Sequence, residues 1–304
     1  MHSWRLYLEV ALRLIKSPRC TISLLVLLVA VVSLSACGAD EATLSEGDGA
    51  AEADKGAALE HVHGLGVNPA DGRLFIATHN GMFTAAEGET TPEPVGARQD
   101  VMGFSVIGPD RFIGSGHPGP DQDLPPSLGL IESRDGGETW ESISLLGEAD
   151  FHVLESAGEK VYGFDGAQGR LLVSSDAGQS WEQRVAPAAM FDLAIDPEDS
   201  SSVVAATEEG LFSSTDEGRS WRPLRSDLAG LLAWPNEKRL YLIDGEGRVQ
   251  LSADGGAVWE TVGSVGGQPA ALIANQDELY AALVDATVQH STDGGATWTV
   301  RTAP

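Results

Sequence analysis

The chain has 304 residues with 45 acidic and 19 basic side chains, which give a formal net charge of −26 at pH 7. A charge of this sign opposes binding to a phosphate backbone, so nucleic acid is excluded as a partner. The two cysteines, Cys20 and Cys37, are not expected to pair, because the first lies in a predicted signal peptide and the second is predicted to carry lipid.

The first 36 residues have the composition of a secretory signal peptide. Basic residues between Arg5 and Arg19 precede the apolar run 22–34, which is shorter than a membrane-spanning helix. The run ends in Leu34-Ser35-Ala36-Cys37, which resembles the lipobox of bacterial lipoproteins. The resemblance implies cleavage before Cys37, lipidation of its thiol and an extracytoplasmic protein anchored to a cell membrane. An uncleaved signal anchor is the alternative.

The next segment, 37–60, is small and acidic with almost no large apolar residue. Such a composition buries too little apolar surface to fold, and it predicts a disordered tether. The predicted organisation is therefore a signal peptide (1–36), a lipidated cysteine with its tether (37–60) and a folded domain (61–304) that we expect to be monomeric.

An eight-residue pattern, Ser-x-Asp-x-Gly-x-x-Trp, occurs five times and is called the box below. The copies begin at Ser133, Ser174, Ser214, Ser252 and Ser291, at intervals of 38 to 41 residues. Short apolar strands repeating with a period near forty predict a β-propeller with one four-stranded blade per repeat. The Gly can adopt positive φ, and the Ser and Asp can bond to backbone amides. The box aspartates are therefore predicted to be structural: Asp135, Asp176, Asp216, Asp254 and Asp293.

A degenerate sixth box, Thr84-x-Ala86-x-Gly88, completes the repeat. The predicted fold class is all-β, a six-bladed propeller. Its blades are predicted at 61–98, 99–145, 149–186, 188–226, 227–264 and 267–304. Blade two carries an insertion at 116–123, which is a candidate lid over the mouth of the central channel.

Strand direction separates the loops onto two faces. The boxes lie on one face, and the starts of the inner strands and ends of the second strands lie on the other, called the top face below. Only His290 maps to the box face. Imidazole combined with thioether or carboxylate ligands suits copper or zinc. The top face of blades one to three is therefore a predicted transition-metal site, with His61, His63, His79, His117, His152 and Met102 as candidate ligands. The alternative is that these histidines only bond to backbone carbonyls.

The same face carries four acids that a glycoside hydrolase would require as nucleophile or acid/base. These candidate catalytic residues are Asp100, Asp150, Asp165 and Asp192.

The box is identified as the Asp-box, or BNR repeat, of sialidases and other propeller proteins. Residues 61–304 resemble a bacterial lipoprotein family labelled glycosyl hydrolase or exo-sialidase-like. The segments that carry the resemblance are His61-Val62-His63-Gly64-Leu65-Gly66-Val67, Ala77-Thr78-His79-Asn80-Gly81, Gly114-Ser115-Gly116-His117-Pro118 and Phe164-Asp165. The resemblance implies a glycosidase-like propeller, but a shared fold does not transfer function.

Sialidase activity is not expected from the residues present. The Phe/Tyr-Arg-Ile-Pro signature of sialidases is absent from the first blade. Tyr162, Tyr241 and Tyr280 occupy equivalent positions early in second strands, which is typical of packing residues rather than of a nucleophile.

The sequence thus predicts a membrane-tethered binding module that presents a top-face pocket to a metal ion or a small ligand. The first alternative is a glycoside hydrolase of the BNR superfamily acting on a glycan. The second is a scaffold that docks another protein of the cell envelope.

Overall fold

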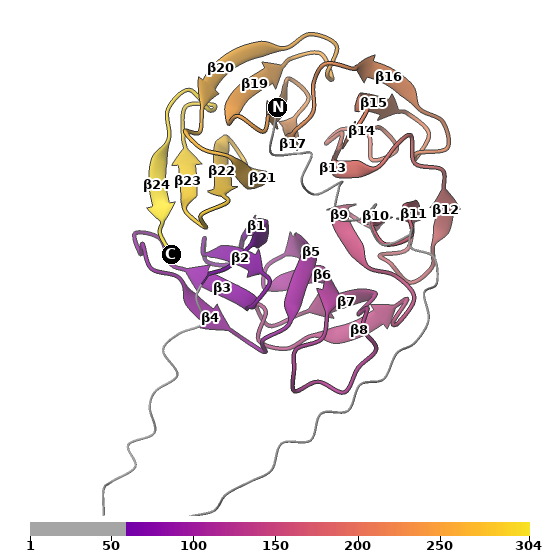
Figure 1. Cartoon of the computed structure of the whole chain (residues 1–304), viewed down its shortest axis with the longest axis vertical. Coiled ribbons are helices and arrows are strands. Elements are labelled where there is room, and N and C mark those ends of the chain that lie inside the picture. The colour runs from indigo at the N-terminus through magenta and orange to yellow at the C-terminus, as the bar shows by residue number, and fades with distance from the viewer. Residues whose placement is uncertain (1–58) are drawn as a thin grey trace, which may run out of the picture. The chain divides into compact units, whose positions relative to one another are not determined.

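The computed structural model describes residues 59–304, and these residues form six four-stranded antiparallel sheets around a central axis (Figure 1). The predicted all-β, six-bladed propeller is confirmed. The predicted signal peptide, Cys37 and nearly all of the predicted tether lie outside the described residues. Within 59–304 there is no helix, and hence none that could cross a membrane.

Each blade consists of four strands that are consecutive in the sequence and neighbours in the sheet. Blades one to three contain β1 (Val62–Val67), β2 (Leu74–Thr78), β3 (Gly81–Ala85), β4 (Glu93–Val95), β5 (Asp100–Gly108), β6 (Arg111–His117), β7 (Leu130–Ser133), β8 (Glu141–Ser144), β9 (Phe151–Ala157), β10 (Lys160–Asp165), β11 (Arg170–Ser174) and β12 (Glu182–Arg184). Blades four to six contain β13 (Met190–Ile195), β14 (Val203–Thr207), β15 (Gly210–Ser214), β16 (Arg222–Arg225), β17 (Leu231–Asn236), β18 (Arg239–Ile243), β19 (Arg248–Ser252), β20 (Glu260–Ser264), β21 (Pro269–Asn275), β22 (Glu278–Leu283), β23 (Val288–Ser291) and β24 (Thr299–Thr302).

The apolar core is divided among the junctions between blades. Each of the six core clusters joins residues of two adjacent blades; one of them packs Ile76 of blade one against Tyr280 of blade six. The second strand of a blade is covered on both faces by its neighbours. This explains why β2 and β14 are buried along their whole length and read as continuous runs of small and apolar residues.

The boxes form the same turn in every copy. In blade three, the Ser174 hydroxyl accepts a hydrogen bond from the Gly178 amide at 2.8 Å and donates to Asp176 at 2.7 Å. Asp176 also accepts from the Ser180 amide and hydroxyl, and these bonds lower the pKa of its carboxyl to about 2. Both carboxylate oxygens are used within the turn in four of the boxes, and Asp254 in the fifth accepts through Oδ1 alone, so the geometry supports a structural role for the box aspartates.

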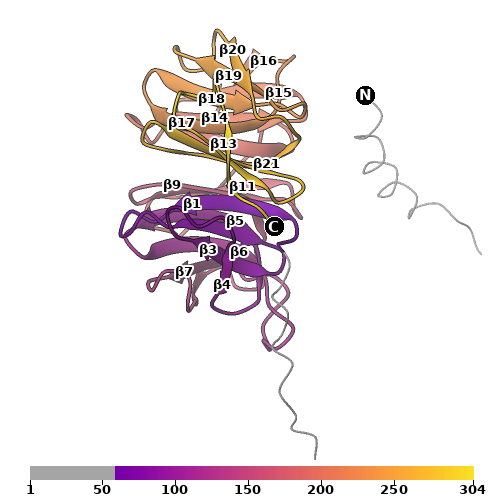
Figure 2. The same ribbon diagram turned by 90° about the vertical axis from the view of Figure 1, so that its left-hand side faces the viewer.

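The ring closes without a strand shared between the two ends of the described chain. The inner strand β1 packs beside both β5 and β21, so blade one touches blades two and six. Arg301 donates to the carbonyls of Ala85, Ala86 and Glu89, and the Ala303 amide donates to the Thr90 carbonyl at 2.9 Å. The C-terminus therefore lies against blade one, as both views show (Figures 1 and 2).

Candidate metal centre on the top face

The first strand of five blades carries a β-bulge close to its start. In blade one, Val62 pairs with Thr78 and Gly64 pairs with Ala77, so His63 has no partner in the ladder. The residues left unpaired in this way are His63, Met102, His152, Phe191 and Ala270. A bulge re-aims the extra side chain. All five residues line the mouth of the central channel, where the cavity measures about 220 Å³.

Two buried aspartates, Asp100 and Asp150, each lie two residues before a bulged position. The histidine side chains lie around these two carboxylates. His79 Nδ1 is 2.8 Å from Asp100 Oδ2, and His63 Nε2 is 3.6 Å from Asp100 Oδ1. His152 Nε2 is 3.0 Å from Asp150 Oδ2.

The remaining two histidines complete the group, which is called the histidine cluster below. His117 lies between the two carboxylates, with Nδ1 3.4 Å from Asp100 Oδ2 and Nε2 3.4 Å from Asp150 Oδ2. The His61 ring lies edge-on to the His79 ring at 6.4 Å between centroids. The structure therefore brings together all five histidines that the sequence placed on the top face.

His61 itself has a φ of 48°, a left-handed conformation that is uncommon for residues other than glycine. Local strain of this kind concentrates at binding and catalytic sites, where the surrounding structure maintains it.

The cluster holds buried polar atoms that the described part of the chain does not satisfy. The side chains of Asp100 and Asp150 are only 10% exposed, and the Oδ1 atom of each has no hydrogen-bond partner there. His63 Nε2 is likewise buried without a hydrogen-bond partner. Leaving a buried polar atom unpaired costs about 1–3 kcal/mol, so three such atoms in one cluster indicate a place for a further binding group.

The histidines beside the two carboxylates have pKa values shifted in opposite directions. Burial lowers the pKa of His63, an effect that the negative charge of Asp100 opposes. The hydrogen bond to Asp150 raises the pKa of His152. Burial alone would raise the pKa of Asp150, but the hydrogen bond from His152 and the charges of His152 and His117 bring it below its usual value. A lowered pKa keeps His63 neutral at pH 7, and the neutral imidazole is the form that binds metal ions.

One part of the cluster has the spacing of a metal site. The ligand atoms of His63, His79 and Asp100 all lie within 4.8 Å of one another. Two imidazoles and one carboxylate make a donor set that suits zinc or copper, and three protein ligands leave a further coordination position open. Two of these residues, His79 and Asp100, also line a pocket of about 450 Å³ together with His117 and the first residues of the insertion.

The rest of the insertion does not reach the channel. Gly119 packs against the backbone of Arg98, and the Gln122 amide donates to Gln99. None of its residues lines the channel mouth, so the insertion borders the cluster from outside rather than covering the channel.

The two remaining candidate acids are bonded to groups other than the histidines. Asp165 is fully buried and forms an ion pair with Arg170 at 3.0 Å, which holds the turn between β10 and β11. Asp192 accepts hydrogen bonds from the backbone amides of Leu193 and Leu232, yet burial raises its pKa to about 7.

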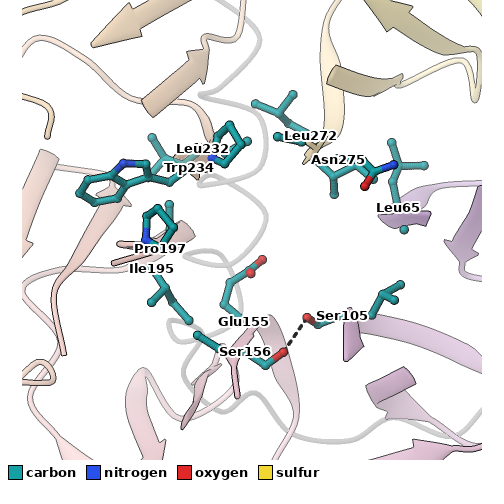
Figure 3. A pocket seen from close by; sticks show the side chains of 18 of the residues that line it. Leu65, Ser105, Glu155, Ser156, Ile195, Pro197, Leu232, Trp234, Leu272 and Asn275 are labelled. Atoms are coloured by element: carbon teal, nitrogen blue, oxygen red, sulfur yellow. Dashed lines mark hydrogen bonds between the residues drawn. The ribbon is translucent and has the colours of Figure 1, made fainter. Parts of the chain in front are cut away.

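Sequence reasoning missed one acid in the channel. Glu155 points into the lower channel, a cavity of about 490 Å³ that is lined by residues of all six inner strands (Figure 3). Burial raises its pKa well above the usual value, and the nearby charge of Asp192 adds to this effect. The available signal was a single acid within the apolar inner strand Phe151–Ala157.

Comparisons with known proteins show the fold and assign no family. No family model and no curated protein matches the chain. Among solved structures, a nidogen/laminin complex matches with a TM-score of 0.60 and 13% identity over 76% of this chain and 93% of that one. A GH74 xyloglucanase from Xanthomonas campestris matches with a TM-score of 0.52 and 16% identity over 80% of this chain and 45% of the enzyme. YCF48 bound to D1 peptide matches with a TM-score of 0.46 and 20% identity over 66% of this chain and 67% of that one.

The present chain thus spans less than half the length of the xyloglucanase it matches. At these identities the similarity shows the propeller fold alone.

Proposed function

We propose that the propeller is a binding module that holds a divalent transition-metal ion, zinc or copper, at His63, His79 and Asp100. The observation that carries this proposal is the approach of their three ligand atoms to within 4.8 Å, at a place where two of the residues have buried atoms without hydrogen-bond partners. An ion there satisfies His63 Nε2 and Asp100 Oδ1 at once. Its open position serves a small ligand that enters from the adjoining pocket.

The proposal also includes a location. The lipobox-like segment ending in Cys37 supports a protein tethered on the outer side of a cell membrane, where a metal-binding propeller meets ions from the surroundings. Cys37→Ala tests this part alone. The variant should move from the membrane fraction to the soluble fraction, and continued membrane association would contradict lipid tethering.

Metal binding is tested with the full chain, purified without a histidine tag and titrated with zinc and with copper by calorimetry at pH 7. We expect saturable binding and a rise in melting temperature, since an ion present at 100 times its Kd stabilises the fold by about 2.7 kcal/mol. The double variant His63→Ala/His79→Ala should lose both effects. His290→Ala is the matched control, because His290 stacks on Tyr280 on the box face.

Equal binding by the native protein and the double variant would overturn the proposal. The rings of His79 and His63 are 57% and 21% exposed, so their removal is not expected to unfold the blade. Circular dichroism of the metal-free proteins checks this point.

A glycoside hydrolase is the second candidate, and Asp192 is the observation that favours it. This acid lines the channel mouth, and a pKa of about 7 keeps its carboxyl partly protonated at neutral pH, as a general acid requires. Turnover of a β-glucan that is lost in Asp192→Asn but kept in the histidine variant would favour hydrolysis over metal binding.

A further inference from the structure

The lower channel contains a carboxylate that the proposed metal site does not use. Glu155 lies on the inner strand β9 of blade three and points into the cavity of about 490 Å³ (Figure 3). Within residues 59–304, its carboxylate forms no hydrogen bond and no ion pair. The acid of the neighbouring blade differs in this respect, since Asp192 accepts hydrogen bonds from two backbone amides.

The acid is specific to blade three. The five bulged inner strands can be compared position by position, and in each of them the residue three places after the bulged residue lines the lower channel. This residue is Glu155 in blade three and Gly66, Ser105, Ala194 and Ile273 in the other four. A bulged inner strand therefore forms without an acid at this position. An acid inside the channel costs free energy through lost solvation, so its presence indicates a group that binds to it.

The lining of the lower channel favours a cation over an anion. No lysine, arginine or histidine is among the described residues that line it, whereas Asp196 adds a second acid. The same lining contains further oxygen acceptors. The hydroxyls of Ser105 and Ser156 lie 3.1 Å apart, and Asn275 adds an amide oxygen (Figure 3).

The size of the lower channel indicates an organic ligand rather than a bare ion. Its volume of about 490 Å³ lies within the range of small-molecule sites, about 300–1,000 Å³. Trp234 lies in its wall and is the only tryptophan of residues 59–304 outside a box (Figure 3). An indole ring offers apolar surface to a carbon chain and attracts a cation. The lining includes Pro69 and Pro197, from the turns that follow β1 and β13, so it extends to the box face.

We propose that the lower channel is a second ligand site, separate from the metal site, which binds a small organic molecule through a protonated primary amine. Glu155 supplies the opposite charge, and the three N–H donors of the ammonium group match the oxygens of Glu155, Ser105 and Ser156. Burial and the charge of Asp192 raise the pKa of Glu155 in the empty channel. A bound ammonium favours the ionised carboxylate and so opposes both effects, with any proton on the carboxyl released to solvent.

Calorimetric titration with n-butylammonium chloride at pH 7 and constant ionic strength tests the inference. The full chain is first treated with EDTA, so the result does not depend on the proposed metal site. We expect saturable binding of n-butylammonium. Binding of 1-butanol, a neutral molecule of nearly the same size, should be much weaker, because it has no charge to pair with Glu155.

Variants of the channel locate the site. Glu155→Gln keeps the shape of the side chain and should weaken binding of n-butylammonium by about 10- to 100-fold, since it removes a hydrogen bond between charged groups. Glu141→Gln is the matched control, because it removes an exposed acid from the outer strand β8, and it should bind as the native chain does. Ser156→Ala should cause a smaller loss, and it remains informative if Glu155→Gln fails to fold.

The outcomes separate this inference from the proposed function. An absence of saturable n-butylammonium binding by the native chain would overturn the second site and leave the metal site in place. Equal binding by the native chain, Glu155→Gln and Ser156→Ala would place the ammonium elsewhere and also overturn it. Equal affinity for 1-butanol would show that charge is not recognised, with the same consequence. A protein that binds n-butylammonium but no zinc or copper would lose the proposed function and keep this one.

Discussion

The two halves of the top face differ in chemistry although their backbones are alike. Equivalent positions can be identified because the same backbone hydrogen bond joins His79 to His61, Gly166 to Asp150, Glu208 to Ala189 and Val284 to Gln268. In blades one to three, the inner-strand starts and second-strand ends supply histidines, aspartates and a methionine. In blades four and six, the corresponding positions hold Ala189, Phe191 and Glu208, and Gln268, Ala270 and Val284.

The comparison shows that the fold does not require the cluster. The bulge forms around Phe191 and Ala270 as it does around His63 and His152. The histidines are therefore not required for a blade to form, and the proposed binding site accounts for their presence on three adjacent blades. The acid of blade four has different partners, since Asp192 accepts hydrogen bonds from backbone amides and not from imidazoles.

The largest expected effect follows from removing the charge at the centre of the first site. Asp100→Asn should weaken zinc binding at that site by at least about 100-fold, because the loss of a ligand exceeds the 10- to 100-fold cost of losing an outer partner. Gln268→Ala, at the equivalent position in blade six, should change nothing. Calorimetric titration measures the zinc affinity of both variants. An equal loss of affinity in the two would show that the two halves of the top face do not differ in zinc binding.

The next effect concerns stability rather than binding. Ser174→Ala leaves the buried Gly178 amide without its acceptor, so unfolding in urea should require about 1–3 kcal/mol less free energy. Thr84→Ala, in the degenerate box of blade one, removes only a donor to the Leu74 carbonyl and should cost less. Metal affinity should stay unchanged in both. A lower affinity in Ser174→Ala would show that the box face and the top face are coupled.

A further effect is expected in the pH dependence of stability. The pKa of Asp192 is about 7 in the fold and about 3.9 in the unfolded chain, so between these values the fold binds more protons. The free energy of unfolding should therefore fall as pH rises from about 4 to 7, by at most about 1.4 kcal/mol per pH unit from this group.

Asp192→Asn should flatten that slope in urea unfolding curves recorded at several pH values. The matched control is Asp176→Asn, because the pKa of Asp176 is about 2 and its titration lies below this window. An unchanged slope in Asp192→Asn would mean that the channel acids are hydrated and titrate normally.

The smallest effect distinguishes copper from zinc. Met102 lines the channel mouth together with His63 and His152, and its thioether is a soft ligand. Met102→Leu keeps the apolar volume, so copper affinity should fall several-fold while zinc affinity stays the same. If neither affinity changes, Met102 is only a part of the channel wall.

The propeller could be predicted because its repeated features are local. The turn at Ser174, Asp176 and Gly178 is held by bonds within five residues, so its sequence pattern survives in each copy. The clustering of the histidines could also be predicted, because the start of the inner strand and the end of the second strand lie at the same end of every blade.

Other features depend on contacts that no local pattern records. The bulges that re-aim His63 and Met102 arise from the register between strands, and the position of His117 between two carboxylates depends on the packing of blade two against blade three. Glu155 was missed because its burial comes from the closure of the ring. The ion pair of Asp165 could have been predicted from the sequence, because its partner Arg170 lies only five residues away.

The closure of the ring has a consequence for how the chain can be rearranged. The last residues reach blade one through Arg301 and Ala303 and add no strand to its sheet. Each blade is thus complete within one stretch of sequence. Joining the ends of the domain and opening it between two other blades would keep every sheet intact, so the propeller is a natural candidate for circular permutation.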